Sequence, residues 1–294
     1  MVICLTTYNG ETYLREQLES LVNQENVDVK ILVGDDGSTD KTLDILTEYV
    51  DLGKIAEVHQ FDRVGTNDNF LNLLKLCKEY DFVAFSDQDD IWKSSKLYEL
   101  SKLLGSEKPE LAFCKRTIFG RVKRRYKSNF LAEVKVGFQN ALVENVAPGN
   151  TMMLNSKAVE LIISSKASKA KFYDSYIYLL ISGLGEVKYL SIPLVSYRIH
   201  ERNAVGIRRF GIRRYMESVK NYLINAQLLH SEYSKTLNVD KLALLEEFMG
   251  GFQEKNKLKS IYRLLTMRTK RQNTLDDLAW RVFTILVRLG NKLD

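Results

Sequence analysis

The alternation of short apolar runs with segments of helical period, over about residues 1–100, constrains the fold of this chain more than any other feature. The apolar runs predict strands at about residues 2–6, 29–34, 56–60 and 81–86. Between the first two runs, Leu14, Leu18 and Leu21 share one helical face. Strands that alternate with helices are typical of βαβ units, so the sequence predicts an α/β fold with a mostly parallel central sheet flanked by helices.

The pattern changes after about residue 110. It first predicts strands at about 111–114, 151–154, 187–190 and 194–198 and helices near 156–164 and 174–182. From about residue 210 onward, apolar residues recur at helical spacing; they include Leu223, Ala226, Leu229, Leu242, Leu245, Met249, Leu258, Ile261, Leu265, Val282, Ile285 and Leu289. We therefore expect an α/β domain over residues 1–206 and a helical C-terminal domain over residues 207–294.

The composition, with 45% hydrophobic residues and 3 prolines, is typical of a folded globular chain. Cys4, Cys77 and Cys114 lie in apolar surroundings without Cys-x-x-Cys spacing, so we expect reduced core residues. The chain opens on a strand-like run without a basic leader, which predicts no signal peptide. No apolar stretch reaches the roughly 18 residues of a membrane span, so we expect a cytoplasmic protein.

Two basic clusters account for much of the net charge of +6 that the sequence carries. They lie at residues 115–127 and 207–214. Such clusters favour an anionic partner, which could be a phosphate-bearing substrate, an acidic membrane surface or nucleic acid.

Three carboxylates within four residues, Asp87, Asp89 and Asp90, follow the apolar run that ends at Phe85. Like charges this close are costly unless a cation neutralises them. Mg²⁺ or Mn²⁺ takes one or two protein carboxylates and completes its shell with substrate phosphates and water. The residues therefore indicate a site for Mn²⁺ or Mg²⁺, although Asp90 can also cap the helix expected at about 94–104.

A second acidic pair, Asp35 and Asp36, ends the second strand, where Gly37 allows a tight turn. Asp36 could simply serve the turn. One carboxylate could instead accept a hydrogen bond from the N3–H of a pyrimidine base. In an open parallel sheet, ligands bind at the carboxyl ends of the strands, where both acidic groups fall.

Three segments at these strand ends occur together: Leu5-Thr-Thr-Tyr-Asn-Gly10, Asp35-Asp-Gly-Ser-Thr-Asp40 and Phe85-Ser-Asp-Gln-Asp-Asp-Ile-Trp92. The combination closely resembles the bacterial family 2 glycosyltransferases of GT-A fold, and within them the rhamnosyltransferase-type branch. The resemblance covers about residues 1–206. It implies a GT-A catalytic domain there. Four arginines next to amphipathic helices, Arg208, Arg209, Arg213 and Arg214, indicate that the C-terminal helices dock on the membrane, with the acceptor or self-association as alternatives.

The resemblance implies roles for individual donor-site residues. Thr6 and Tyr8 would line the nucleoside pocket, with Tyr8 stacking on the base that Asp36 reads. Asp89 would bind the metal, and Asp87 would lie nearer the ribose or a metal-bound water. Further residues carried over to the donor site are Arg63, Asn69, Gly149 and Asn150.

Two later segments also match the family. Asp174, which opens a helix, matches the catalytic base. The branch often has His-Asp-Trp-Trp where this chain has Tyr173-Asp174-Ser175-Tyr176, which leaves the acceptor and the sugar open. His200 lies in a Tyr-Arg-x-His-x-x-Asn segment and would add an imidazole to the metal or contact the diphosphate.

The expected reaction is an inverting, metal-dependent transfer of a hexose to a hydroxyl of a growing glycan, with Asp174 as general base. A carboxylate that accepts from N3–H reads uracil and thymine alike, so the donor could be dTDP-rhamnose, UDP-glucose or UDP-galactose. The acceptor would be a lipid-linked glycan at the inner face of the membrane or a protein-linked one, and the C-terminal helices suggest a homodimer.

Three other functions compete with this interpretation. The chain could be a non-catalytic nucleotide-sugar-binding or scaffolding protein of a glycosylation complex. A nucleotidyltransferase is disfavoured because residues 5–15 contain no Gly-rich phosphate loop with basic residues. Nucleic acid is disfavoured because no recognised binding module accompanies the basic clusters.

Overall fold

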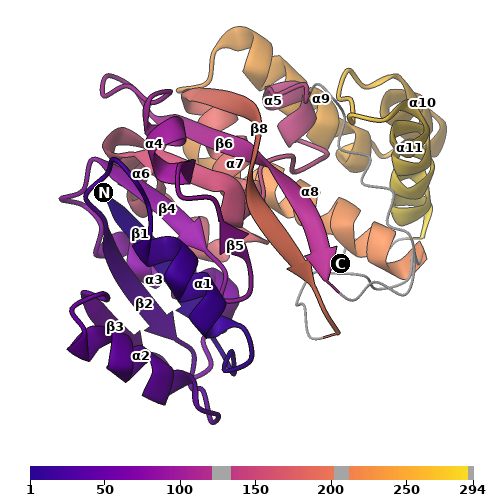
Figure 1. Ribbon diagram of the computed structural model, residues 1–294. Helices are drawn as coiled ribbons and strands as arrows, with labels where there is room; N and C mark the ends of the chain where they lie inside the picture. Colours follow the sequence, from indigo (N-terminus) through magenta and orange to yellow (C-terminus); the bar gives the residue numbers. More distant parts are fainter. Residues whose placement is uncertain (121–133, 202–211, 291–294) are drawn as a thin grey trace. The chain divides into compact units, whose positions relative to one another are not determined.

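The structure, a computed structural model, describes residues 1–120, 134–201 and 212–290 (Figure 1). The chain forms two compact units. The first, unit 1, comprises residues 1–133, 147–168 and 186–207, and the second, unit 2, comprises residues 134–146, 169–185 and 208–294. The predicted division into a catalytic domain, residues 1–206, and a helical C-terminal domain, residues 207–294, stays a prediction.

Unit 1 is built on one eight-stranded sheet with the order β3-β2-β1-β4-β7-β6-β8-β5. The strands are β1 (Val2–Thr7), β2 (Lys30–Asp35), β3 (Glu57–Gln60), β4 (Phe82–Ser86), β5 (Ile91–Trp92), β6 (Glu110–Gly120), β7 (Met152–Asn155) and β8 (Glu186–Ile199). Strands β1 to β4 pair in parallel, as do β6 and β8, whereas β7 and β5 are antiparallel to their neighbours. The predicted mostly parallel sheet is confirmed.

The two strands predicted at 187–190 and 194–198 are one strand, β8. Its pairing with β6 shifts register on both sides of Lys115, which lies opposite Pro193. Proline has no N–H for the ladder, so the irregularity falls there and divides the apolar pattern in two. The short strand β5 was not predicted.

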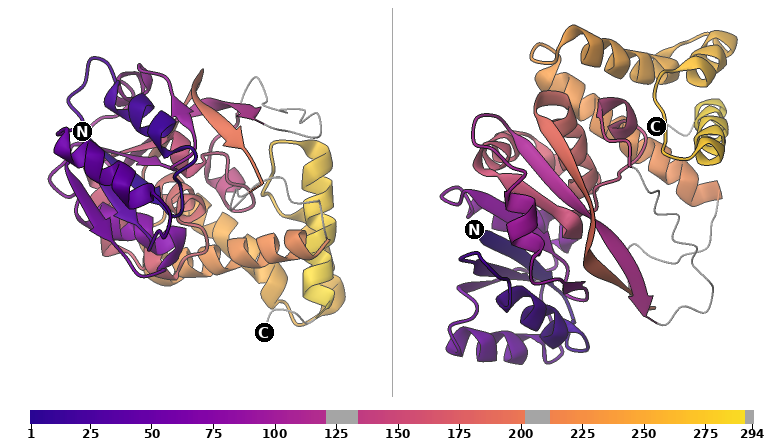
Figure 2. Two further views of the ribbon diagram at one scale, coloured as in Figure 1. Left: turned by 60° about the horizontal axis from the view of Figure 1, so that its bottom comes forward. Right: turned by 45° about the horizontal axis from the view of Figure 1, so that its top comes forward.

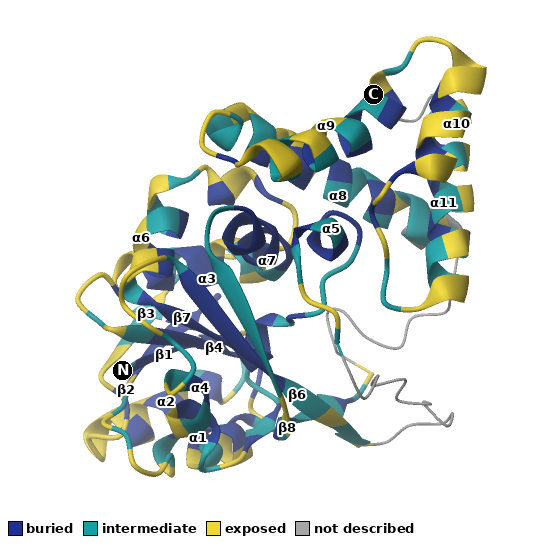
Figure 3. Cartoon of the chain, turned by 90° about the horizontal axis from the view of Figure 1, so that it is seen from above, coloured by how far each residue is buried: buried dark blue, intermediate teal, exposed yellow. Residues whose placement is uncertain are grey.

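Helices cover both faces of this sheet (Figure 3). They are α1 (Leu14–Val22), α2 (Thr42–Asp51), α3 (Gly65–Lys75), α4 (Lys96–Ser101) and α6 (Ser156–Ser164), with short 3-10 turns η1 (Gly149–Thr151) and η2 (Ala167–Lys169). Ile3 and Leu5 of β1 pack toward α1, α2 and α4. On the opposite face, the sulfur of Cys4 lies 3.4 Å from that of Cys77, at the end of α3. Both faces of β1 are therefore buried, and all three cysteines are free and buried as predicted.

Unit 2 is helical in its described residues. It contains α5 (Phe138–Ala141), α7 (Tyr173–Leu184), α8 (Ile212–Tyr233), α9 (Val239–Gln253), α10 (Lys257–Thr266) and α11 (Thr274–Leu289). Helix α10 packs on α9, α11 packs on α8, and α10 and α11 contact each other (Figure 2). The helices predicted near 174–182 and beyond residue 210 are confirmed.

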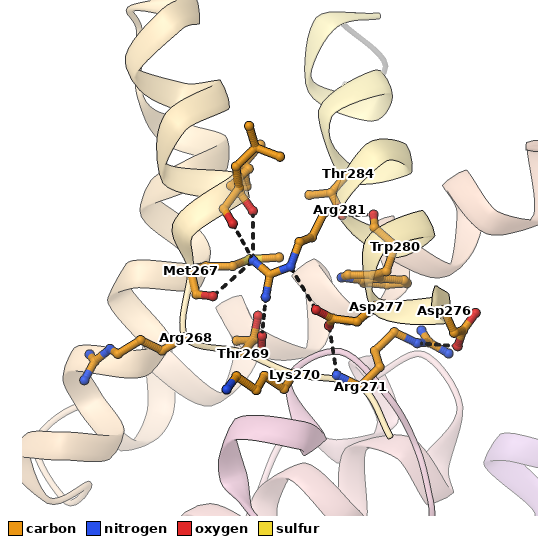
Figure 4. A network of polar contacts seen from close by, with 12 residues as sticks. Met267, Arg268, Thr269, Lys270, Arg271, Asp276, Asp277, Trp280, Arg281 and Thr284 are labelled. Atoms are coloured by element: carbon orange, nitrogen blue, oxygen red, sulfur yellow. Dashed lines mark hydrogen bonds and ion pairs between the residues drawn. The ribbon is translucent and has the colours of Figure 1, made fainter. Parts of the chain in front are cut away.

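A polar network fixes the connection between α10 and α11 (Figure 4). The guanidinium of Arg281 donates to the backbone carbonyls of Leu265, Met267 and Thr269 at 2.8, 3.1 and 2.8 Å. Its Nε donates to the Asp277 carboxylate at 2.9 Å. One half-buried cation thus satisfies carbonyls that a chain leaving a helix would otherwise leave unpaired.

None of the helices in the described residues combines the length and the apolar character needed to cross a bilayer. Of the two predicted basic clusters, residues 121–127 and 207–211 lie outside the described residues.

Candidate functional site

The loops after β1 and β2 are locked together at the carboxyl edge of the sheet. The Thr7 hydroxyl donates to Asp35 at 2.8 Å, and the Ser38 backbone N–H donates to the other oxygen of Asp35 at 2.8 Å. Asp35 is fully buried. Of the two adjacent carboxylates, Asp35 therefore holds the turn, which leaves Asp36 as the one closer to solvent.

Tyr8 projects from the end of β1 with 40% of its surface exposed. Its backbone is fixed by the Gln88 side chain, which accepts from the Tyr8 N–H at 2.8 Å and donates to the Tyr8 carbonyl at 3.0 Å. The guanidinium of Arg63 lies 4.1 Å from the centre of the Tyr8 ring. The structure thus brings together two predicted donor-site residues, joined by a cation–π contact.

Gln88 was missed by the sequence reasoning. A side chain on Gly10 would meet its carboxamide at 2.3 Å, so Gly10 leaves the space that Gln88 fills. Gln88 lies inside the acidic motif, so its position could have drawn attention to it. A glutamine in that position does not by itself suggest that it holds another loop.

Asp36 is 8% exposed, and its two carboxylate oxygens accept the backbone N–H groups of Val64 and Gly65 at 2.7 and 2.9 Å. These donors begin α3, so Asp36 caps that helix across the loop. A carboxylate offers about four lone-pair sites, so each oxygen can accept one more hydrogen bond.

Two further predicted residues, Thr6 and Asn69, are buried at this edge. Asn69 donates to the Gly34 carbonyl of β2 at 2.8 Å. A side chain on Gly34 would meet the Asn69 oxygen at 1.9 Å, so the two residues pack without space between them. Asn69 thus positions β2, and its part in donor binding stays a prediction.

The acidic motif after β4 meets the end of β8. His200 Nε2 lies 2.8 Å from an Asp89 carboxylate oxygen, and both side chains are 15% exposed. The Arg198 Nε donates to the Asp89 carbonyl at 2.9 Å, and the Tyr13 ring lies 4.8 Å from the His200 ring. Two residues 111 positions apart, both predicted to serve a metal, therefore face each other.

Asp90 is not a helix cap, as the sequence suggested it could be. It is fully buried, accepts the Arg198 N–H at 3.1 Å and accepts a hydrogen bond from the Asn150 carboxamide. The cap position before α4 is Ser95. Burial, with the nearby charge of Asp89 second, raises the pKa of Asp90 to about 6.

Lys96 lies fully buried beneath this motif. Its ammonium donates to the Asn150 carbonyl at 2.7 Å and lies 3.0 Å from the centre of the Trp92 ring. Burial lowers the pKa of Lys96 to about 7, against the opposing effects of Cys114 and Asp90. A lysine on an amphipathic helix ordinarily faces solvent, so its residue type carried no signal of burial.

Asn150 and Gly149, both predicted near the sugar, belong to the buried turn η1. The Asn150 side chain is committed to Asp90 and its carbonyl to Lys96. It supports the acidic motif from behind, and direct contact with the donor stays a prediction.

Asp87 is half-buried near Tyr197. Burial raises the pKa of Tyr197 to about 12, with Arg116 opposing and the acidic motif adding to the rise. The phenol therefore stays protonated and can donate a hydrogen bond beside three carboxylates.

Asp174, the predicted catalytic base, lies in unit 2, in the first turn of α7. One of its carboxylate oxygens accepts the Ser175 N–H at 2.8 Å. Its role in catalysis stays a prediction.

Within the described ranges, no group of three or more His, Cys, Asp or Glu side chains is arranged to hold a metal by itself. Asp89 and His200 supply two candidate ligands. Two ligand atoms at right angles around an ion, each about 2.1 Å from it, are about 3 Å apart, which is close to the 2.8 Å between these atoms. The two side chains are in direct contact at this distance, and a bound ion would replace that contact and take its other ligands from substrate and water.

This sheet, with helices on both faces and carboxylates at its strand ends, has the GT-A fold. A model of the family described as glycosyl transferase family 2 matches residues 2–161. The chain belongs to this family, and it is a glycosyltransferase.

Two relatives agree with this assignment. The chain is 29% identical over 228 residues to the dTDP-rhamnosyl transferase RfbG of Shigella flexneri, covering 69% of this chain and 73% of the relative. It is 25% identical over 261 residues to the putative glycosyltransferase EpsH of Bacillus subtilis, covering 87% of this chain and 70% of that protein.

Solved structures show the same fold. TarS of S. aureus in complex with UDP-GlcNAc matches with a TM-score of 0.60 at 17% identity, over 99% of this chain and 91% of that one. The mannosyltransferase PcManGT of Pyrobaculum calidifontis, in complex with GDP-Man and Mn²⁺, matches with a TM-score of 0.60 at 14% identity, over 99% and 87%.

Proposed function

We propose that this chain transfers a hexose from a dTDP- or UDP-sugar to a hydroxyl of a growing glycan, with inversion and with a divalent metal. The observation that carries the proposal is the Asp89–His200 pair at 2.8 Å, near the strand ends that hold Tyr8 and Asp36. A bound Mn²⁺ or Mg²⁺ would neutralise the charge that develops on the departing nucleoside diphosphate.

The residues of unit 1 suit a pyrimidine nucleotide. Tyr8 offers a ring for stacking, although Arg63 covers one face, so a base must take the other face or displace the guanidinium. Asp36 keeps acceptor capacity for an N3–H beyond its two backbone partners. Uracil and thymine share this group, so Asp36 does not choose between UDP and dTDP.

The likeness to a dTDP-rhamnosyl transferase favours dTDP-rhamnose as the donor, ahead of UDP-glucose and UDP-galactose. Asp174 is proposed as the general base that accepts the proton of the acceptor hydroxyl as the new glycosidic bond forms. The acceptor is proposed to be a lipid-linked glycan, with a protein-linked glycan as the alternative. The homodimer through the C-terminal helices stays a prediction.

The test is release of nucleoside diphosphate by the purified chain with Mn²⁺ from dTDP-rhamnose, UDP-glucose and UDP-galactose, with and without acceptor mixtures. Release from one donor should disappear on addition of a chelator and in Asp89→Asn and His200→Ala. Asp81→Asn, an exposed aspartate before β4, serves as the matched control and should keep full activity.

A different result would favour the alternative function, a non-catalytic nucleotide-sugar-binding protein. That result is metal-dependent nucleotide binding in calorimetry without release of nucleoside diphosphate from any donor or acceptor combination. Release that survives chelation would contradict the metal at Asp89 and His200. Asp174→Asn should abolish transfer while leaving donor binding unchanged, because a general base acts on the acceptor.

A further inference from the structure

Helix α10 carries apolar side chains on a face that does not pack against its own unit. Leu258, Tyr262 and Leu265 are 47% to 78% exposed. Successive residues turn by about 100° in a helix, so these three lie within about 60° of one another. The buried residues of α10 are Ser260 and Leu264, on the opposite face.

The buried side of α10 is fixed by its contact with α9. Ser260 donates to the Gly251 carbonyl at 2.6 Å, and a side chain on Gly251 would meet Leu264 at 2.4 Å. A small movement of α10 would therefore not bury its exposed stripe. It points away from the helix on which α10 packs.

Helix α11 repeats this arrangement over a longer stretch. Its buried residues, Trp280, Thr284 and Val287, share one side. On the other side lies a continuous apolar stripe, 40% to 79% exposed, formed by Leu275, Leu278, Val282, Leu286 and Leu289. Exposed apolar residues gathered in this way mark an interaction surface.

The charge around these helices is strongly positive. Residues 255–290 contain nine basic and two acidic residues, an excess of seven positive charges that exceeds the +6 of the whole chain. The two acids, Asp276 and Asp277, are already paired with Arg271 and Arg281. Arg263 and Arg268 pair with Glu254 and Glu247, just outside this range. Among the described residues, Lys255, Lys257, Lys259 and Lys270 are exposed and form no ion pair, so these four charges are left for an outside partner.

The free cations flank the apolar stripe of α10. Lys257 and Lys259 are exposed and lie about 100° to either side of Leu258, and exposed Lys255 precedes the helix. None of the three forms an ion pair with an acidic residue in the part of the chain that is described. An apolar stripe with lysines on both flanks is the pattern of a helix that lies in a membrane interface.

We propose that the stripes of α10 and α11 dock on an anionic lipid bilayer surface. Leu258, Tyr262 and Leu265, with the α11 stripe, enter the boundary between headgroups and acyl chains, while Lys257 and Lys259 reach the lipid phosphates. A second copy of this chain fits less well, because it would bring the same excess of positive charge against itself. The proposal concerns a surface apart from the donor site.

The test is flotation of the full chain with vesicles of phosphatidylcholine alone or with 30% phosphatidylglycerol, a composition chosen to supply anionic lipid. The chain should float with the anionic vesicles, and binding should fall as salt rises. The double variant Leu275→Ser with Leu278→Ser should weaken binding about tenfold or more at every salt concentration, since both side chains are removed from the interface.

A second variant tests the contribution of the lysine charges to binding. Lys257→Gln with Lys259→Gln should weaken binding about fivefold for each lysine and flatten the salt dependence. Matched controls are Leu52→Ser and Lys78→Gln, exposed positions of unit 1, which should bind like the parent chain. All of these positions are exposed, and unchanged circular dichroism melting establishes that the variants fold.

Failure to float with anionic vesicles would overturn the proposal, as would equal flotation of the parent and the leucine variant. Concentration-dependent dimers that the leucine variant abolishes, without vesicle binding, would identify the stripes as a contact between copies instead. Nucleoside diphosphate release does not enter this assay, so its outcome is independent of the proposed transferase activity.

Discussion

Replacing the buried Lys96 by methionine should stabilise unit 1 at low pH and lose that advantage as pH rises. Lys96 is fully buried, and burial lowers its pKa from 10.5 to about 7. Below pH 7 the lysine is charged in both the folded and the unfolded chain, so the folded state bears the whole cost of burying the charge. That difference of about 3.5 pKa units corresponds to about 5 kcal/mol.

The sign of the pH dependence follows from proton binding. Between pH 7 and 10.5 the unfolded chain keeps a proton that the folded chain has released, so the stability of the parent chain rises with pH. Methionine has no such proton. It also leaves the Asn150 carbonyl without its partner, at a cost of about 1–3 kcal/mol that does not depend on pH.

The variant should therefore be more stable than the parent by about 2–4 kcal/mol at pH 6. This difference should shrink by about 3 kcal/mol by pH 9.5. Urea unfolding is followed through Trp92, whose ring lies 3.0 Å from the ammonium, with Trp280→Phe in both proteins so that Trp92 alone reports. Lys93→Met, at an exposed neighbour, is the control. A stability difference that stays constant from pH 6 to 9.5 would refute the assignment of Lys96 as a desolvated cation.

Three further substitutions test the packing of the two units. Gly34→Ala should lower the free energy of unfolding by about 1–3 kcal/mol in urea titrations, because the new methyl meets the buried Asn69 oxygen; Gly105→Ala, which meets its neighbours at 3.6 Å or more, should change it little. Asp36→Ala should cost about 1–2 kcal/mol by removing the cap of α3 and should also weaken nucleotide binding in calorimetry. A variant that weakens binding without loss of stability would contradict the capping role. Arg281→Lys should cost about 2–3 kcal/mol and speed hydrogen exchange between α10 and α11, since lysine cannot reach several carbonyls at once; exchange at the parent rate would show that the network does not hold the connection.

Most of the fold was predictable because the spacing of apolar residues along the chain differs between strands and helices. A strand buried on both faces, such as β1, is a continuous apolar run, and a helix on a sheet repeats its apolar residues at helical spacing. The division of β8 into two predicted strands failed where Pro193 interrupts the ladder, and β5, two residues long, has no period to detect.

The position of part of the candidate site was also predictable, because it follows from the order of the strands. The carboxyl ends of parallel strands meet at one edge, so Asp36, Asp89 and Tyr8 could be placed there from the chain order alone. Residues whose role depends on a distant partner carried no such signal. Gln88 binds the Tyr8 backbone, and Lys96 is buried beneath Asn150, and neither contact follows from residue type or spacing.

The C-terminal helices separate what sequence determines from what tertiary structure decides. The sequence by itself determined that Leu258, Leu265, Val282 and Leu289 lie on helices and form apolar stripes, because helical geometry fixes which residues share a face. It could not determine which way a stripe points, since burial depends on the partner that a face meets. The fold buries Ser260 and Leu264 of α10, and Trp280, Thr284 and Val287 of α11. It leaves Leu258, Leu265, Val282 and Leu289 of the predicted stripes exposed, and Ile261 and Ile285 half-buried. Packing against α9 and α8 made that choice, and it left these leucines and valine at the surface.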